Sequence, residues 1–195
     1  MSLSSEQKLV SAGWADVSAT AARYVSLLKI RPMSAVIYSA VVGLIAAPGS
    51  VDIPTAILAI VCIALGGGGS AALNMWYEAD LDAQMARTAK RALPAGKVKA
   101  NRALLFGSTL CLGSIAIMGW FVNLIAAAVL AATILAYFGL YTVVLKRRTS
   151  LNVVLGGSLA GLLTPLSGWA AATGSIGSEA LVLFAYVLFL SLIHI

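Results

Sequence analysis

The sequence predicts an all-α fold, a polytopic bundle of transmembrane helices, and three observations carry this prediction. First, 61% of the 195 residues are hydrophobic, only 10% are charged, and the mean hydropathy is +0.97. A soluble domain has about 25% charged residues, so this composition excludes soluble globular and disordered chains. Second, long intervals contain no charge at all. Third, the basic residues gather in a few short segments.

The uncharged intervals predict the membrane spans. They cover residues 53–77, 103–145 and 149–178. Because a bilayer-spanning helix needs about 20 apolar residues, the middle interval must hold two spans. Trp favours the membrane interface and Asn favours turns, so we place their connection at Trp120–Asn123. The six expected spans are near 33–49, 53–73, 103–119, 122–145, 151–172 and 179–195.

The basic residues predict the orientation in the membrane. All 13 lie in residues 1–31, 87–102 and 146–148, which six spans place on one side of the bilayer. By the positive-inside rule that side is cytoplasmic. We therefore expect an integral protein of a bacterial cytoplasmic (inner) membrane, with residues 1–31 as a cytoplasmic N-terminal segment. The basic charge suits anionic lipid, and nucleic acid is not an expected partner because no aromatic residues interleave with the basic ones.

The most informative segment follows the second expected span. Three of the seven acidic residues of the chain lie within residues 78–82. If the span continues as a helix, Asn74, Glu78 and Asp82 stand at positions i, i+4 and i+8 and form one stripe. Asp80 then points elsewhere.

Such a stripe of oxygen atoms suits a hard cation at the mouth of a helical bundle. Mg²⁺ usually binds one or two carboxylates together with substrate phosphates. Arg87, Lys90 and Arg91 follow closely enough to hold the same phosphates. The alternative interpretation is a solvated loop of mixed charge. Because the acidic residues begin where the span ends, the segment favours a functional site.

This segment resembles the first acidic motif of the UbiA-type intramembrane prenyltransferases. The pattern Asn-x-x-x-acid-x-Asp-x-Asp-x-x-Met-x-Arg-Thr-x-x-Arg extends from Asn74 to Arg91. Its continuation at Met85, Arg87-Thr88 and Lys90-Arg91 is similar to the heme-directed branch, the protoheme IX farnesyltransferases or heme O synthases. The family usually has Asp at the position of Glu78.

Other segments resemble the same family, over roughly residues 25–190. The stretch with Tyr141, Lys146-Arg147-Arg148-Thr149 and Asn152 is similar to the family pattern at the end of the fourth span. Further features also resemble the family: Gly156-Gly157, Gly161, Pro165 and Gly168-Trp169 in the fifth span, and Lys29-Ile30-Arg31 before the first.

The resemblance implies a function. Members of the heme-directed branch transfer the farnesyl group of farnesyl diphosphate to a vinyl group of protoheme IX (heme b), which is a substrate rather than a cofactor. The product is heme O for cytochrome oxidase, and Mg²⁺ assists ionisation of the diphosphate. Heme-handling or oxidase assembly proteins are the implied partners. A quinone-precursor or chlorophyllide acceptor, or a non-catalytic membrane fragment, stay open as alternatives.

The resemblance also implies roles for individual residues. The implied metal ligands are Asn74, Glu78, Asp80 and Asp82. The implied diphosphate-binding residues are Asn74, Arg87, Arg91, Lys146 and Arg147. The implied catalytic residues are Asp82, Lys146 and Tyr141.

The same resemblance bears on the extent of the domain. Family members have about nine spans of about 20 residues each, against about six here, and carry a second Asp-rich motif. We therefore expect residues 32–190 to form a partial transmembrane prenyltransferase domain and residues 191–195 to be a non-native tail. We expect the chain as written to be inactive by itself.

Overall fold

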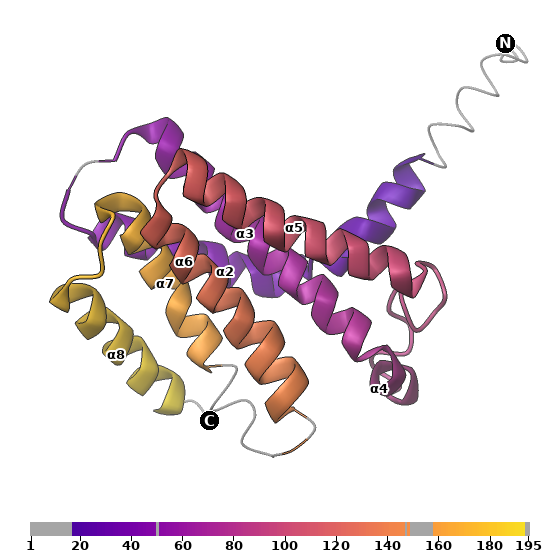
Figure 1. Cartoon of the computed structure of the whole chain (residues 1–195). Helices are drawn as coiled ribbons and strands as arrows, with labels where there is room; N and C mark the ends of the chain where they lie inside the picture. The colour runs from indigo at the N-terminus through magenta and orange to yellow at the C-terminus, as the bar shows by residue number, and fades with distance from the viewer. Residues whose placement is uncertain (1–16, 50, 147, 149–157, 194–195) are drawn as a thin grey trace, which may run out of the picture.

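A computed structural model describes residues 17–49, 51–146, 148 and 158–193, and all regular secondary structure in this part is helical (Figure 1). The predicted all-α fold is thus confirmed. The helices are Val17–Leu27, α2 (Ile30–Ala46), α3 (Ile53–Tyr77), α4 (Ala79–Gln84), α5 (Ala100–Phe121), α6 (Leu124–Ile134), the π-helix η1 (Leu135–Leu145), α7 (Ser158–Thr173) and α8 (Ser178–Ile193).

Each of the six expected spans overlaps at least one of these helices, and the fourth overlaps both α6 and η1. Three helical segments among the described residues are long and apolar enough to cross a membrane: Ile53–Tyr77, Ala100–Phe121 and Leu124–Leu145. A fourth results if Val17–Leu27 and Ile30–Ala46, which meet at 59°, count as one bent span. The expected total of six stays a prediction, and residues 151–157 of the fifth span lie outside the described residues.

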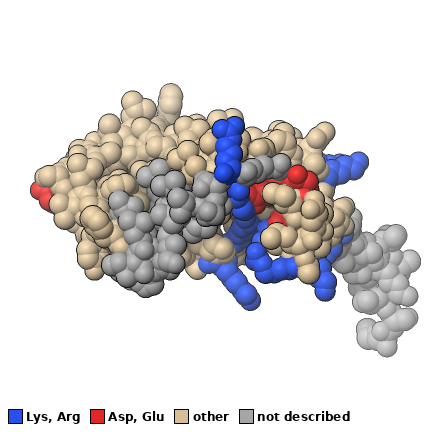
Figure 2. Space-filling model, turned by 90° about the horizontal axis from the view of Figure 1, so that it is seen from below, with Lys and Arg blue, Asp and Glu red and all other residues tan. Residues whose placement is uncertain are grey.

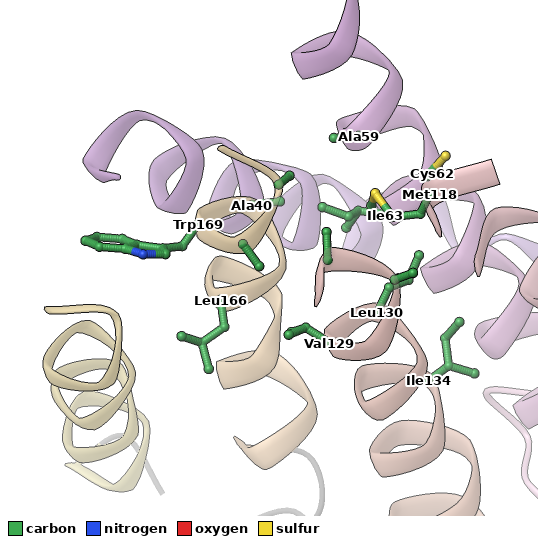
Figure 3. Packing of buried hydrophobic residues seen from close by; sticks show 14 of the residues in the cluster. Ala40, Ala59, Cys62, Ile63, Met118, Val129, Leu130, Ile134, Leu166 and Trp169 are labelled. Atoms are coloured by element: carbon green, nitrogen blue, oxygen red, sulfur yellow. The ribbon is translucent and has the colours of Figure 1, made fainter. Parts of the chain in front are cut away.

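The helices pack around one apolar core. α3 and α5 lie side by side, and α7 lies between α6 and α8 (Figure 1). Ile63 of α3, Met118 of α5, Leu130 of α6 and Leu166 of α7 meet in this core (Figure 3). Because lipid tails are as apolar as these side chains, close packing rather than the hydrophobic effect holds such helices together.

A second, smaller apolar cluster fixes the end of the bundle that carries the basic residues. Leu27, Met75 and Val98 are buried in it, and the helix Val17–Leu27 thereby packs against α3 and against the segment between α4 and α5. The cluster thus joins the helix Val17–Leu27, α3 and the segment between α4 and α5 at this end of the bundle.

The turn predicted at Trp120–Asn123 is confirmed. α5 ends at Phe121, and Asn123 is the N-cap of α6, where its Oδ1 accepts a hydrogen bond from the backbone nitrogen of Ala126 at 2.7 Å. Its Nδ2 also donates to the backbone oxygen of Ala170 on α7 at 2.9 Å. One side chain therefore both starts α6 and ties it to α7.

Replacing Asn123 by alanine is expected to lower the free energy of unfolding by about 1–2 kcal/mol, because a helix cap and a partly buried hydrogen bond to α7 are lost together. Thermal unfolding in detergent measures the effect. Asn123→Asp keeps the cap acceptor but not the donor, so it is expected to lose less. Equal stability of all three proteins would contradict the assigned roles.

Candidate active site

The acidic segment forms the stripe that its spacing predicts. α3 ends at Tyr77 and α4 begins at Ala79, but the i to i+4 hydrogen bonds continue across the junction. The backbone nitrogen of Glu78 donates to the oxygen of Asn74 at 3.0 Å, and that of Asp82 donates to the oxygen of Glu78 at 2.8 Å. Asn74, Glu78 and Asp82 are 2%, 4% and 4% exposed, whereas Asp80 is exposed. The three polar side chains are therefore held inside the bundle.

Each residue of the stripe contacts a cation from a different part of the chain. Lys29 donates from Nζ to Asn74 Oδ1. Lys146 Nζ lies 2.6 Å from Glu78 Oε2. Arg91 Nη1 lies 2.7 Å from Asp82 Oδ2 and 3.0 Å from Asp82 Oδ1. Three cations thus converge on one polar stripe, and Figure 2 shows blue side chains surrounding a group of red ones.

Lys29 occupies an unusual backbone position. It directly precedes α2, at the bend after the helix Val17–Leu27, with φ 49° and ψ 57°. No other non-glycine residue in the described ranges has a positive φ. Burial, followed by the positive charge of Arg91, lowers the pKa of Lys29 to about 8. A strained backbone that carries a partly buried cation is typical of a functional position.

The π-helix η1 brings a second group of polar residues to the stripe. Thr142 Oγ1 accepts a hydrogen bond from Asn74 Nδ2 at 3.1 Å and donates to the backbone oxygen of Tyr137 at 2.9 Å. Lys146 Nζ lies 5.6 Å from the ring centre of Tyr141, which itself lies 5.6 Å from the ring of Tyr137. The wide turns of a π-helix are often found at functional sites.

Not every predicted site residue reaches this arrangement. Arg87 is exposed and forms no ion pair with a described residue, and Asp80 lies outside the buried stripe. Arg147 lies outside the described residues. Three residues of the site were not predicted from the sequence: Lys29, Thr142 and Thr88. Thr88 supports the stripe, because its Oγ1 donates a hydrogen bond to the backbone oxygen of Asp82 at 2.9 Å. The signals for Lys29 were its position directly before a span and the resemblance of Lys29-Ile30-Arg31 to the family pattern.

The donor set fits a cation that also binds phosphate. Within the described residues, no three His, Cys, Asp or Glu side chains lie close enough to hold a metal by themselves. Glu78 Oε1 is nevertheless buried without a hydrogen-bond partner in this part of the chain. Since Mg²⁺ commonly takes one or two carboxylates and completes its shell with phosphate and water, Glu78 and Asp82 suffice for such a site.

An apolar pocket of about 340 Å³ opens beside the stripe. Among the described residues that line it, only Lys29 and Arg91 are charged, and they are the partners of Asn74 and Asp82. The other lining residues are Pro32, Met33, Val36, Gly67, Ser70, Ala71, Thr133, Tyr137, Gly161 and Thr164. The pocket can therefore hold an apolar chain whose anionic end meets the two cations.

Curated relatives match most of this chain at about half sequence identity. A protoheme IX farnesyltransferase of Bartonella henselae is 51% identical over 84% of this chain, which corresponds to 52% of the relative. One of Parvibaculum lavamentivorans is 52% identical over 84% of this chain and 51% of the relative. The chain spans about half the length of the curated relatives that it matches.

Solved structures share the fold. A structure described as a digeranylgeranylglyceryl phosphate synthase matches 88% of this chain and 60% of its own, with a TM-score of 0.74 and 20% identity. A UbiA homolog from Archaeoglobus fulgidus bound to GPP and Mg²⁺ matches 87% of this chain and 59% of its own, with a TM-score of 0.69 and 18% identity. Residues 35–195 match the UbiA prenyltransferase family. The chain belongs to the UbiA prenyltransferase family.

Proposed function

We propose that the protein transfers the farnesyl group of farnesyl diphosphate to a vinyl group of protoheme IX, with diphosphate as the leaving group. Addition of water to the resulting cation then gives the hydroxyethylfarnesyl side chain of heme O. The observation that carries this proposal is the pairing of a buried carboxylate stripe with three converging cations at the mouth of an apolar pocket. The names of the relatives from Bartonella henselae and Parvibaculum lavamentivorans support the choice of acceptor.

The stripe and its cations hold the diphosphate. Mg²⁺, when bound with the diphosphate, neutralises its charge and makes it a better leaving group. Glu78 and Asp82 are the proposed ligands, with Asn74 beside them and Asp80 as an outer carboxylate. Lys29, Arg91 and Lys146 contact the stripe and therefore lie beside the oxygens of the bound diphosphate. Their positive charges stabilise the negative charge that develops on the diphosphate as the carbon–oxygen bond breaks.

Further residues orient this machinery. Tyr141 positions Lys146 through its ring, at 5.6 Å from Nζ, and Thr142 holds the amide of Asn74. Arg87 and Arg147 stay predicted phosphate ligands. The apolar pocket takes the isoprenoid chain and excludes water, which would otherwise capture the allylic cation. The ring of Tyr137 lines that pocket and offers a π-face to the positive charge.

The setting of the reaction is part of the proposal. The basic residues and the stripe lie at the cytoplasmic face of a bacterial inner membrane, where farnesyl diphosphate and heme b enter from the lipid or the cytoplasm. Proteins that handle heme or assemble the oxidase are the proposed partners.

Heme O formation tests the function directly. Residues 1–190 of this chain, joined to the remaining C-terminal half of the Bartonella henselae relative, are expected to convert hemin and farnesyl diphosphate to heme O in Mg²⁺-containing membranes. Chromatography with mass detection measures the product. Prenylation of a quinone precursor or of chlorophyllide, but not of heme, would replace the proposed acceptor. No transfer to any acceptor, with the chimera inserted, would favour a non-catalytic role.

Lys146 is expected to be essential in that assay. Lys146→Gln removes a cation from the diphosphate site and leaves Glu78 buried without its ion-pair partner. Transfer should fall by about 10²-fold or more, as when one charge stabiliser of a transition state is removed. Arg148→Gln is the matched control, because Arg148 is an exposed cation two residues away. Equal losses in both variants would contradict a specific role for Lys146.

A further inference from the structure

A second pocket lies on the other side of Lys29 and Arg91. It has a volume of about 380 Å³ and is lined by the helix Val17–Leu27, by α3 and by the segment between α4 and α5. Of the nine described residues that line it, five are cations and none is acidic. The cations are Arg23, Lys29, Lys90, Arg91 and Lys97, and the other lining residues are Ala22, Ser26, Met75 and Ala92. We refer to it as the basic pocket.

The charge of the basic pocket is only partly compensated. Arg91 is paired with Asp82, and Lys29 contacts the neutral side chain of Asn74. Arg23, Lys90 and Lys97 form no ion pair with any residue in the described ranges. Like charges lining one hollow raise the local potential and attract an anion.

The walls of the basic pocket are firmly held. Leu27 and Met75 pack in the smaller apolar cluster together with Ala92, which fixes all three walls against one another. The backbone nitrogen of Lys97 donates to the oxygen of Ala92 at 2.9 Å, within a turn in which Gly96 has a φ of 68°. The pocket is therefore formed before any ligand arrives, which lowers the entropic cost of binding.

The composition of the basic pocket selects the kind of anion. A Mg²⁺-bound diphosphate needs protein carboxylates nearby, and these lie on the stripe rather than in this pocket. Cations without carboxylates suit an anion that carries no metal. Because Lys29 and Arg91 line both pockets, a ligand in the basic pocket lies next to the anionic end of a ligand in the apolar one.

We propose that the basic pocket binds the two propionate carboxylates of the porphyrin acceptor. This assignment rests on the proposed function, which makes protoheme IX the acceptor. Arg23, Lys90 and Lys97 supply cations that have no ion-pair partner in the described part of the chain. Met75 and Ala92 offer apolar surface to the propionate methylenes. The pocket is thus the acceptor subsite, separated from the diphosphate site by Lys29 and Arg91.

Porphyrin binding by the full 195-residue chain in neutral detergent tests this assignment. The probes are protoporphyrin IX and its dimethyl ester, which lacks both negative charges, and binding is followed by porphyrin fluorescence. Arg23→Gln with Lys97→Gln should weaken binding of the free acid by about tenfold or more, the effect of losing charge-assisted hydrogen bonds. Binding of the ester should not change. Lys99→Gln is the control, because Lys99 is an exposed cation of the same segment and does not line the pocket.

Binding of farnesyl diphosphate with Mg²⁺ distinguishes a failure of the acceptor subsite from a failure of the proposed function. The double variant is expected to keep that binding, which also shows that it is folded. The acceptor subsite would be overturned if the double variant lost as much binding of the ester as of the free acid, or if Lys99→Gln weakened binding of the free acid as much as the double variant does. Neither result would contradict the proposed function. Loss of farnesyl diphosphate binding alone, or of binding to phosphatidylglycerol vesicles alone, would assign the pocket to those ligands instead. If neither porphyrin binds while farnesyl diphosphate does, the acceptor subsite is overturned, and heme O formation by the chimera decides the proposed function separately.

Discussion

Replacing Asp82 by alanine is expected to abolish prenyl transfer while the protein still inserts into the membrane. The change removes the Asp82 carboxylate, which is a proposed Mg²⁺ ligand. Its two oxygens lie 2.7 and 3.0 Å from Arg91 Nη1, so Arg91, a proposed diphosphate ligand, loses the contact that holds it in place. Loss of one transition-state stabiliser costs about 10²–10³-fold in rate, so losing two should leave no measurable product. Heme O formation by the chimera measures the effect.

Two further variants make this prediction specific. Asp82→Asn keeps the shape of the side chain and lacks its charge, and it is expected to lose nearly as much activity as Asp82→Ala. Glu179→Ala removes an exposed carboxylate from the first turn of α8, and it is expected to leave transfer unchanged. Normal turnover by Asp82→Ala, with correct insertion, would refute the assignment of the stripe as the diphosphate site.

Replacing Gly168 by valine is expected to disrupt the packing of α2 against α7. A Cβ atom at Gly168 would collide with the backbone oxygen of Ala40, and one at Gly43 would collide with the backbone oxygen of Pro165. The two helices therefore approach each other through a reciprocal pair of glycines, and neither backbone can yield without separating them. Overpacking of this kind costs about 1–3 kcal/mol or more. Thermal unfolding in detergent should show a lower midpoint.

Gly161→Ala is the matched control on the same helix. A Cβ atom at Gly161 meets no described residue within 4 Å, so alanine should be neutral or slightly stabilising there because of its higher helix propensity. Gly43→Ala should destabilise in the same direction as Gly168→Val. Unchanged stability of Gly168→Val would show that α2 and α7 are not held in this close contact.

The membrane helices and the stripe follow from local features of the sequence. Apolar runs between charges mark the helices, because a helix satisfies its own backbone hydrogen bonds without water. Asn74, Glu78 and Asp82 share one face because of their spacing, and the structure confirms this even though α3 and α4 are separate helices. The exposure of Asp80 follows from the same spacing.

The partners of the stripe do not follow from local features. Lys29 stands 45 residues before Asn74, and Lys146 stands 68 residues after Glu78. Whether such residues meet depends on how the helices cross and rotate. The wider turns of the π-helix η1 change the direction in which the side chain of Lys146 leaves the helix. The residues of η1 are nearly all apolar, so they show no hydrophobic periodicity from which the π turns could be predicted.

The sequence by itself predicted the apolar helices, the segments in which the basic residues gather and the residues that form the polar stripe. All three depend on the order of residues along the chain, through helical periodicity and transfer from water to lipid. Only the tertiary structure decided that Lys29, Arg91 and Lys146 converge on the stripe and that Lys29 and Arg91 divide an apolar pocket from a basic one. The reason is that these contacts join distant segments, and their geometry depends on helix packing at positions such as Gly43 and Gly168.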